Sequence, residues 1–147
     1  MRHPFRPRLP AALLAAVLLC AACSGIPLRE RRAAELSRYR AYAGPPVRSL
    51  VWSTGYKRWT ALSADTLLVW TNIEQPYLVR VFQPCADLLF ARRIGVSSTL
   101  DAVQVQRDFV TADGWRCMIR TIRPIDYARL QRAQPAGRAP PAHRPQR

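Results

Sequence analysis

Histidine is nearly absent from this chain of 147 residues, and its scarcity excludes several kinds of chemistry. The two histidines are His3, near the start, and His143, near the end. Ser-His-Asp catalysis, Cys-His catalysis and His/Cys zinc sites are therefore excluded from the central region. The sequence also lacks the patterns G-x-x-x-x-G-K, G-x-G-x-x-G and G-x-S-x-G, which mark phosphate loops, dinucleotide sites and nucleophile elbows. We expect no catalytic residues, no cofactor and no metal site.

Lysine and acidic residues are also scarce. Of the 23 basic residues only Lys57 is a lysine, and nine residues are acidic, which gives a net charge of +14. Such a charge favours anionic partners, namely nucleic acid, phospholipid or lipopolysaccharide. An alternative is that the arginines reflect a GC-rich genome, because the chain is also rich in alanine and proline. The charge is uneven, since residues 129–147 hold five arginines and no acid.

Long apolar runs are missing, and the longest one covers residues 11–25. It is too short to span a membrane, which takes roughly 20 apolar residues. Arg2, Arg6 and Arg8 precede it, and small residues end it. A basic start, a short apolar run and small residues are the layout of an export signal.

The end of this run resembles the lipobox of bacterial lipoproteins, in which cleavage occurs just before a cysteine that carries lipid. The matching residue is Cys23, preceded by Ala21 and Ala22, and the departure from the pattern is Cys20 in place of the usual leucine. The resemblance predicts a signal peptide at residues 1–22 and lipidation, including palmitate, at Cys23. Ser24 after the cysteine implies the outer membrane, with the chain attached through its acyl groups. The alternative is an ordinary export signal without lipid.

Two further cysteines, Cys85 and Cys117, remain after Cys20 and Cys23. An even pair in an exported protein predicts a disulfide. It would close a loop worth roughly 3.5 kcal/mol in the chain-entropy model. The spacing is not that of a C-x-x-C redox motif.

Residues 23–42 are charged and alanine-rich, and we interpret them as a lipidated start followed by a short helical linker, which Gly44, Pro45 and Pro46 end. From residue 47 the pattern changes to strands. The continuous run Leu67–Thr71 predicts a strand buried on both faces. Asp113-Gly114 predicts a hairpin leading to a strand with Trp115, Cys117, Ile119 and Thr121 on one face and Arg116, Met118 and Arg120 on the other. Between the strands, residues 84–91 suit one or two helical turns. A brief helical turn through Leu130 is a further expectation.

These elements predict a mainly β fold, a small antiparallel meander curled into a barrel or half-barrel, with a short helix between strands and a helical N-terminal linker. We expect one disulfide-closed domain at residues 43–128, followed by a basic, proline-rich tail at residues 129–147 that is disordered.

Two further classes of function are disfavoured. A glycosidase-like hydrolase needs two facing carboxyl groups, and the domain offers seven acids: Asp65, Glu74, Asp87, Asp101, Asp108, Asp113 and Asp126. Several of these have roles in turns or at helix ends. Base stacking on Trp52, Trp59, Trp70 or Trp115 would suit nucleic acid, but core packing is the default for these residues, and export separates the protein from most nucleic acid.

Residues 42–126 contain a combination of features that includes Tyr42–Val47, Trp59, Leu67–Thr71, the two cysteines and Ile122–Asp126. In these features the chain resembles a family of short proteobacterial lipoproteins, of a kind common in xanthomonad-type bacteria and catalogued as a domain of unknown function. This resemblance implies an envelope location and the cysteine pair, and no reaction or ligand. We therefore expect a periplasmic lipoprotein of the outer membrane with a non-catalytic binding or scaffolding role, in which an exposed sheet face or the basic tail contacts its partners. Anionic lipid or lipopolysaccharide is the expected partner of the tail, and no protein partner can be named. The alternatives are a β module that binds a small ligand or glycan inside the barrel and a carboxylate-dependent hydrolase.

Overall fold

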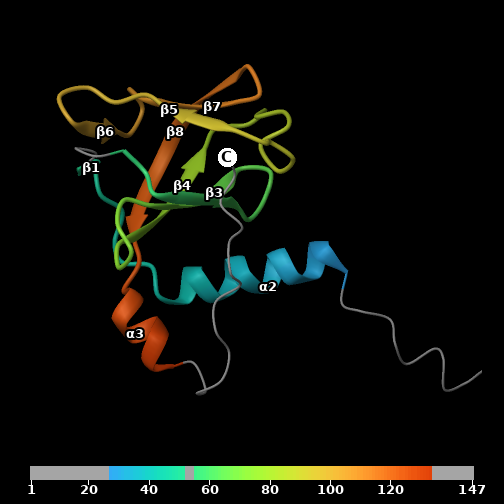
Figure 1. Ribbon diagram of the computed structural model, residues 1–147, viewed down its shortest axis with the longest axis vertical. Coiled ribbons are helices and arrows are strands. Elements are labelled where there is room, and N and C mark those ends of the chain that lie inside the picture. Colours follow the sequence, from blue (N-terminus) through green and yellow to red (C-terminus); the bar gives the residue numbers. More distant parts are fainter. Residues whose placement is uncertain (1–26, 52–54, 134–147) are drawn as a thin grey trace, which may run out of the picture. The chain divides into compact units, whose positions relative to one another are not determined.

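The computed structural model describes residues 27–51 and 55–133. The predicted signal with Cys23, residues 52–54 with Trp52, and residues 134–147 of the expected tail lie outside these ranges. The described residues form two helices and eight strands (Figure 1): α2 (Leu28–Ala41), β1 (Ser49–Val51), β2 (Arg58–Ala61), β3 (Thr66–Trp70), β4 (Pro76–Val81), β5 (Ile94–Val96), β6 (Ala102–Gln104), β7 (Phe109–Ala112), β8 (Trp115–Pro124) and α3 (Tyr127–Arg132). In the described ranges, neither helix combines the length and the apolar character needed to cross a bilayer.

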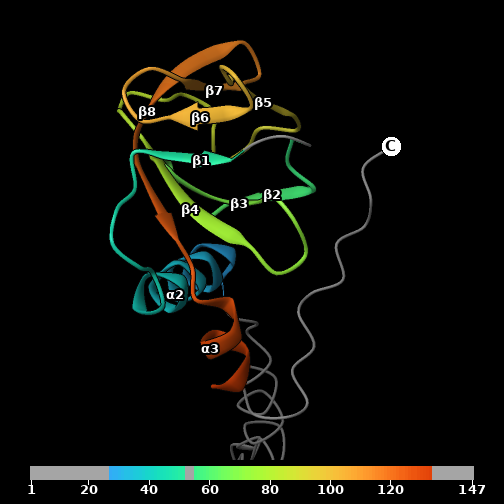
Figure 2. The same cartoon turned by 90° about the vertical axis from the view of Figure 1, so that its left-hand side faces the viewer.

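The strands form an antiparallel six-stranded half-barrel in the order β2-β3-β4-β8-β7-β5, and β1 pairs with β6 in a separate ribbon (Figure 2). The mainly β prediction is confirmed. The hairpin at Asp113-Gly114 is confirmed too: both residues have positive φ, of 43° and 96°, and they connect β7 to β8. Asparagine, aspartate and glycine tolerate this conformation best, so the local sequence determines where the chain reverses.

The prediction of a strand buried on both faces is confirmed for Leu67–Trp70, because every residue of β3 is buried, whereas Thr71 lies in the bend after the strand. Leu67 and Val69 point to an inner core that β1 and β6 close on the other side with Leu50 and Val103. Alternate residues of β3 point to the opposite face, where Leu68 and other apolar side chains form a second core. A strand that separates two cores has no polar face, which explains the unbroken apolar run.

Helix α2 takes part in the second core and is more than a linker. Its Leu36 and Tyr39 are buried against Leu68 and Trp70 of β3 and Leu78 of β4. Burial raises the pKa of the Tyr39 hydroxyl above its ordinary value, and the charge of Glu35 acts in the same direction. The folded domain therefore includes part of residues 23–42. The expected start of the domain at residue 43 is therefore too late. The sequence pattern did not indicate this, because Leu36 and Tyr39 pack against sheet residues that are distant in the chain.

Helix α3 confirms the expected helical turn near Leu130 and moves the other domain boundary. Asp126 caps the helix by accepting a hydrogen bond from the Arg129 backbone N–H at 2.9 Å, and Leu130 is buried in the second core. Residues 129–132, which we expected in the tail, are therefore part of the fold.

The chain after α2 is attached to β8 by Arg123. Its Nε donates to the Gly44 carbonyl at 2.8 Å, and Ala43 bridges to Ile125. Arg123 and Asp126, which belong to the closing segment Ile122–Asp126 quoted for the family resemblance, thus have structural roles.

Two local expectations are wrong. Residues 86–90 form turns instead of a regular helix, because Asp87 has a φ of 62°, outside the right-handed helical range. The short helix of the domain is α3. On β8, Val81 pairs with Ile119 and Arg80 with Thr121, so Arg120 is an extra residue in a β-bulge. The bulge shifts the alternation, and Ile122 takes the buried position expected for Thr121. Trp115, at the hairpin end, is exposed.

Candidate functional site

The interior of the half-barrel is filled. Its cavity measures about 10 Å³ and is lined by apolar side chains that include Val69, Val110 and Ile119. This volume is at the lower limit for one water molecule, and small-molecule pockets measure about 300 Å³ or more. Among the described residues the inner core is therefore packing, and this cavity is too small for the ligand that we considered inside the barrel.

Asp65 is held in the turn between β2 and β3 by three hydrogen bonds. The hydroxyls of Ser63 and Thr66 donate to its carboxylate at 2.7 Å and 2.8 Å, and Arg80 on β4 donates and forms an ion pair at 2.5 Å. Partial burial alone would raise the pKa of Asp65. The hydrogen bonds from Ser63, Thr66 and Arg80 outweigh this effect, so the pKa lies below its ordinary value. This arrangement holds an ionised carboxylate in a structural role.

Asp108 is the buried acid of the domain, with 3% of its surface exposed. Its carboxylate accepts hydrogen bonds from the Ser97 hydroxyl at 2.6 Å and from the Gln104 backbone N–H at 2.8 Å. The Ser97 oxygen in turn accepts from the Phe109 backbone N–H at 3.0 Å. The network closes the loop between β6 and β7, and a buried polar group satisfied in this way stabilises the loop.

Two other acids also serve the backbone. Asp113 accepts a hydrogen bond from the Arg92 backbone N–H at 3.3 Å beside the β7–β8 turn, and Asp126 caps α3. Among the described residues, no group of three or more His, Cys, Asp or Glu side chains could hold a metal ion.

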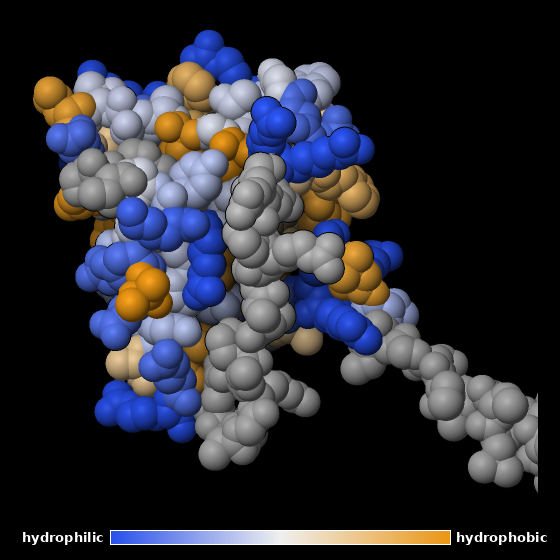
Figure 3. All heavy atoms as spheres, viewed as in Figure 1, coloured by the Kyte–Doolittle hydropathy of each residue, from blue (hydrophilic) through white to orange (hydrophobic). Residues whose placement is uncertain are grey.

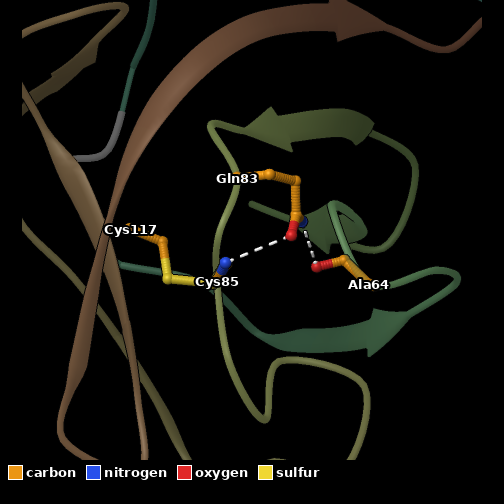
Figure 4. The surroundings of a disulfide bond; sticks show 4 residues. All are labelled: Ala64, Gln83, Cys85 and Cys117. Carbon is orange, nitrogen blue, oxygen red and sulfur yellow. Dashed lines mark hydrogen bonds between the residues drawn. A yellow bond between two sulfur atoms is a disulfide. The ribbon is translucent and has the colours of Figure 1, made fainter.

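The disulfide that we predicted links Cys85 to Cys117 across 32 positions (Figure 4). Both cysteines are buried in the inner core. Gln83 fixes the approach to Cys85: its side-chain oxygen accepts from the Cys85 backbone N–H at 3.2 Å, and its nitrogen donates to the Ala64 carbonyl at 2.7 Å. The bond therefore joins the segment after β4 to the first part of β8.

The surface feature most suited to binding is one end of the outer sheet face. The other end of this face carries Leu68, Trp70 and Leu78, which the two helices cover. Toward β7 and β8 the face is uncovered. We call this region the open outer face and define it by five residues: Phe82, Phe109, Arg116, Met118 and Arg120.

Each arginine of the open outer face lies over an aromatic ring. The Arg116 guanidinium lies 3.7 Å from the centre of the Phe109 ring, and the Arg120 guanidinium lies 5.5 Å from that of Phe82. Met118 is opposite Phe109 in the strand register, and its backbone carbonyl accepts from the Phe82 N–H at 2.9 Å. Met118 is 49% exposed and Phe82 39% exposed.

Sequence reasoning placed Arg116, Met118 and Arg120 on one strand face but did not identify the aromatic partners. Phe109 comes from β7 and Phe82 from the end of β4, and only strand register brings them together. The signal in the sequence was the alternation Arg-Cys-Met-Ile-Arg at positions 116–120. It places two arginines and a methionine on the strand face that the alternation marks as exposed.

The domain surface is basic. The described residues include 17 basic and nine acidic side chains, a net charge of +8. On the side drawn in Figure 3, hydrophilic residues dominate and hydrophobic ones form separate spots. Within the described ranges the one ion pair joins Arg80 to Asp65, so Arg116 and Arg120 are not neutralised by a carboxylate.

Comparison with known proteins identifies the family and no relative of known function. No curated protein and no solved structure matches the chain. One family model, described as a family of unknown function (DUF6491), matches residues 6–140. The chain therefore belongs to DUF6491, a family of unknown function.

Proposed function

We propose that this protein is an exported lipoprotein, attached to the periplasmic face of the outer membrane through Cys23, whose β domain is a non-catalytic binding module of the cell envelope. The observation that carries the proposal is the buried Cys85–Cys117 disulfide, because such bonds persist in oxidising compartments outside the cytosol. The basic and apolar layout of residues 1–25 supports the same location. The family match begins at residue 6, so residues 6–25 of this segment lie within the matched region.

Three structural observations support a binding role over catalysis. The inner core is filled, the hydrogen-bonded acids Asp65, Asp108, Asp113 and Asp126 hold turns, loops and a helix end, and the open outer face presents apolar and cationic groups to solvent. Exposed aromatic side chains, methionine and arginine together are typical of the centres of protein interfaces.

Lipidation can be tested by labelling cells with an alkyne analogue of palmitate. We expect the wild-type chain to take up the label and to fractionate with membranes. The Cys23→Ala variant should lose both properties, because the acyl groups are attached to that sulfur. The matched control is Cys20→Ala, which changes the neighbouring cysteine and should keep the label. An unlabelled wild-type chain, or loss of label in Cys20→Ala alone, contradicts the proposal.

A further inference from the structure

The open outer face is a sheet surface that the domain leaves uncovered. The same face is buried where Leu68, Trp70 and Leu78 meet the helices, whereas Met118 and Phe82 remain in contact with solvent. Arginine, methionine and aromatic residues are enriched in the centres of protein interfaces, where lysine and acidic residues are depleted. The five residues of this face consist of two arginines, two phenylalanines and one methionine.

Charge excludes two candidate occupants of this face. Residues 134–147 carry three arginines and no acid, so they would be repelled by Arg116 and Arg120. A second copy without residues 1–22 has 20 basic and nine acidic residues, a net charge of +11, which opposes self-association through a basic surface. Within the described ranges no carboxylate forms an ion pair with Arg116 or Arg120, so a bound partner must supply the negative charge.

We propose that the open outer face binds an extended acidic segment of a partner protein. Two of its carboxylates pair with Arg116 and Arg120, and an apolar side chain between them contacts Met118 and Phe82. Arginine donates two parallel hydrogen bonds to a carboxylate, and a guanidinium that lies on an aromatic ring is already held in one plane. The inference deepens the proposed function, because it names the surface and the partner chemistry of the binding role.

The strand geometry predicts the spacing of the acidic segment. Arg116 and Arg120 are four positions apart on β8, a separation of at most roughly 13 Å at strand rise, because the strand bends at the Arg120 bulge. In an extended segment, side chains of residues i, i+2 and i+4 share one face. The matching pattern is therefore Glu-x-Leu-x-Glu, in which both carboxylates and the leucine point to the sheet.

The test uses the purified full-length chain with its disulfide intact and two fluorescent peptides. One peptide contains Glu-Thr-Leu-Thr-Glu, and its isomer contains Glu-Leu-Thr-Thr-Glu, which turns the leucine to the other face. We expect the first peptide to bind more tightly by fluorescence anisotropy, and its binding to weaken as salt rises. Equal binding of the two isomers overturns the predicted register and with it the proposal.

Charge reversal identifies the surface. Arg116→Glu combined with Arg120→Glu should weaken binding at least tenfold, since each exposed charge pair is worth up to about fivefold. The matched control is Arg48→Glu combined with Arg107→Glu, which makes the same change of net charge at exposed arginines near the β1–β6 ribbon. The control should bind within twofold of wild type. Equal weakening in both pairs means unspecific attraction and overturns the proposal.

Two further measurements complete the design. Met118→Asp keeps both arginines and should also weaken binding, which covers the case that the double variant does not fold. Soluble dihexanoyl phosphatidylglycerol replaces the peptide in a parallel titration, and binding of this lipid in place of the peptide would assign the face to membrane and overturn the proposal. Neither assay depends on Cys23, so a failed lipidation test and a failed peptide test are distinguishable.

Discussion

Removal of the disulfide should strongly destabilise the domain without changing its fold. Cys85 and Cys117 are 32 positions apart, and closing a loop of this length stabilises the folded state by about 3.5 kcal/mol in the chain-entropy model. The replaced sulfurs are buried, so Cys85→Ala combined with Cys117→Ala also removes some packing. A domain of this size unfolds with about 5–15 kcal/mol, so the variant should remain folded at 25 °C.

The assay is urea unfolding followed by circular dichroism, supported by thermal melts. A loss of about 3.5 kcal/mol corresponds to a fall in Tm of roughly 15–25 °C for a domain of about 100 residues. The matched control is a reducing agent added to both proteins: it should lower the stability of the wild type and leave the double variant unchanged. A loss below about 1 kcal/mol would refute the reasoning. It would mean that the two segments already lie close together in the unfolded ensemble without the disulfide.

Two other predictions concern the turn acid and the helix. The pKa of Asp65 is lowered in the folded state from its ordinary 3.8, so the stability it contributes is present above that pH and is lost as the pH falls through the folded value. Asp65→Asn should therefore cost about 1 kcal/mol at pH 7. Urea melts should show this difference shrinking as the pH falls below 3.8, whereas a constant difference would contradict the assignment. Leu36→Ala should lower the unfolding free energy by about 2–4 kcal/mol because Leu36 is buried in the second core. Leu28→Ala, at a site 62% exposed in the same helix, should change it by less than about 0.5 kcal/mol. Equal effects would mean that α2 is not packed as described.

Several features of the fold could be predicted because they depend on neighbouring residues. Asp113-Gly114 determines a turn from two adjacent residues, and the apolar run Leu67–Thr71 indicates burial on both sides of one strand. The cysteine pairing followed from counting, since only Cys85 and Cys117 remained for the folded part.

Other features depend on the partner strand and could not be derived in this way. The bulge at Arg120 is visible only in the register between β4 and β8, and it moves Ile122 inside. The packing of Leu36 depends on residues more than 20 positions away, so the charged composition of α2 favoured a linker. The open outer face could not be derived from the sequence for the same two reasons. Strand pairing brings Phe82 and Phe109 to it, and its exposure depends on where the helices stop covering the sheet.

Stacking of the arginines explains how the open outer face can stay hydrated and still suit the acidic segment that we propose. The Arg116 guanidinium covers Phe109, which removes apolar carbon from water and keeps a charge at the surface. Such a contact at an exposed site is worth about 0.5–1 kcal/mol. A carboxylate that approaches the edge of the guanidinium gains hydrogen bonds without displacing it from the ring, because stacking uses the face of the group and pairing uses its edge. Replacing Arg116 by lysine keeps the charge but loses the flat stack and the fork of donors, so this substitution should weaken the acidic peptide more than it changes stability.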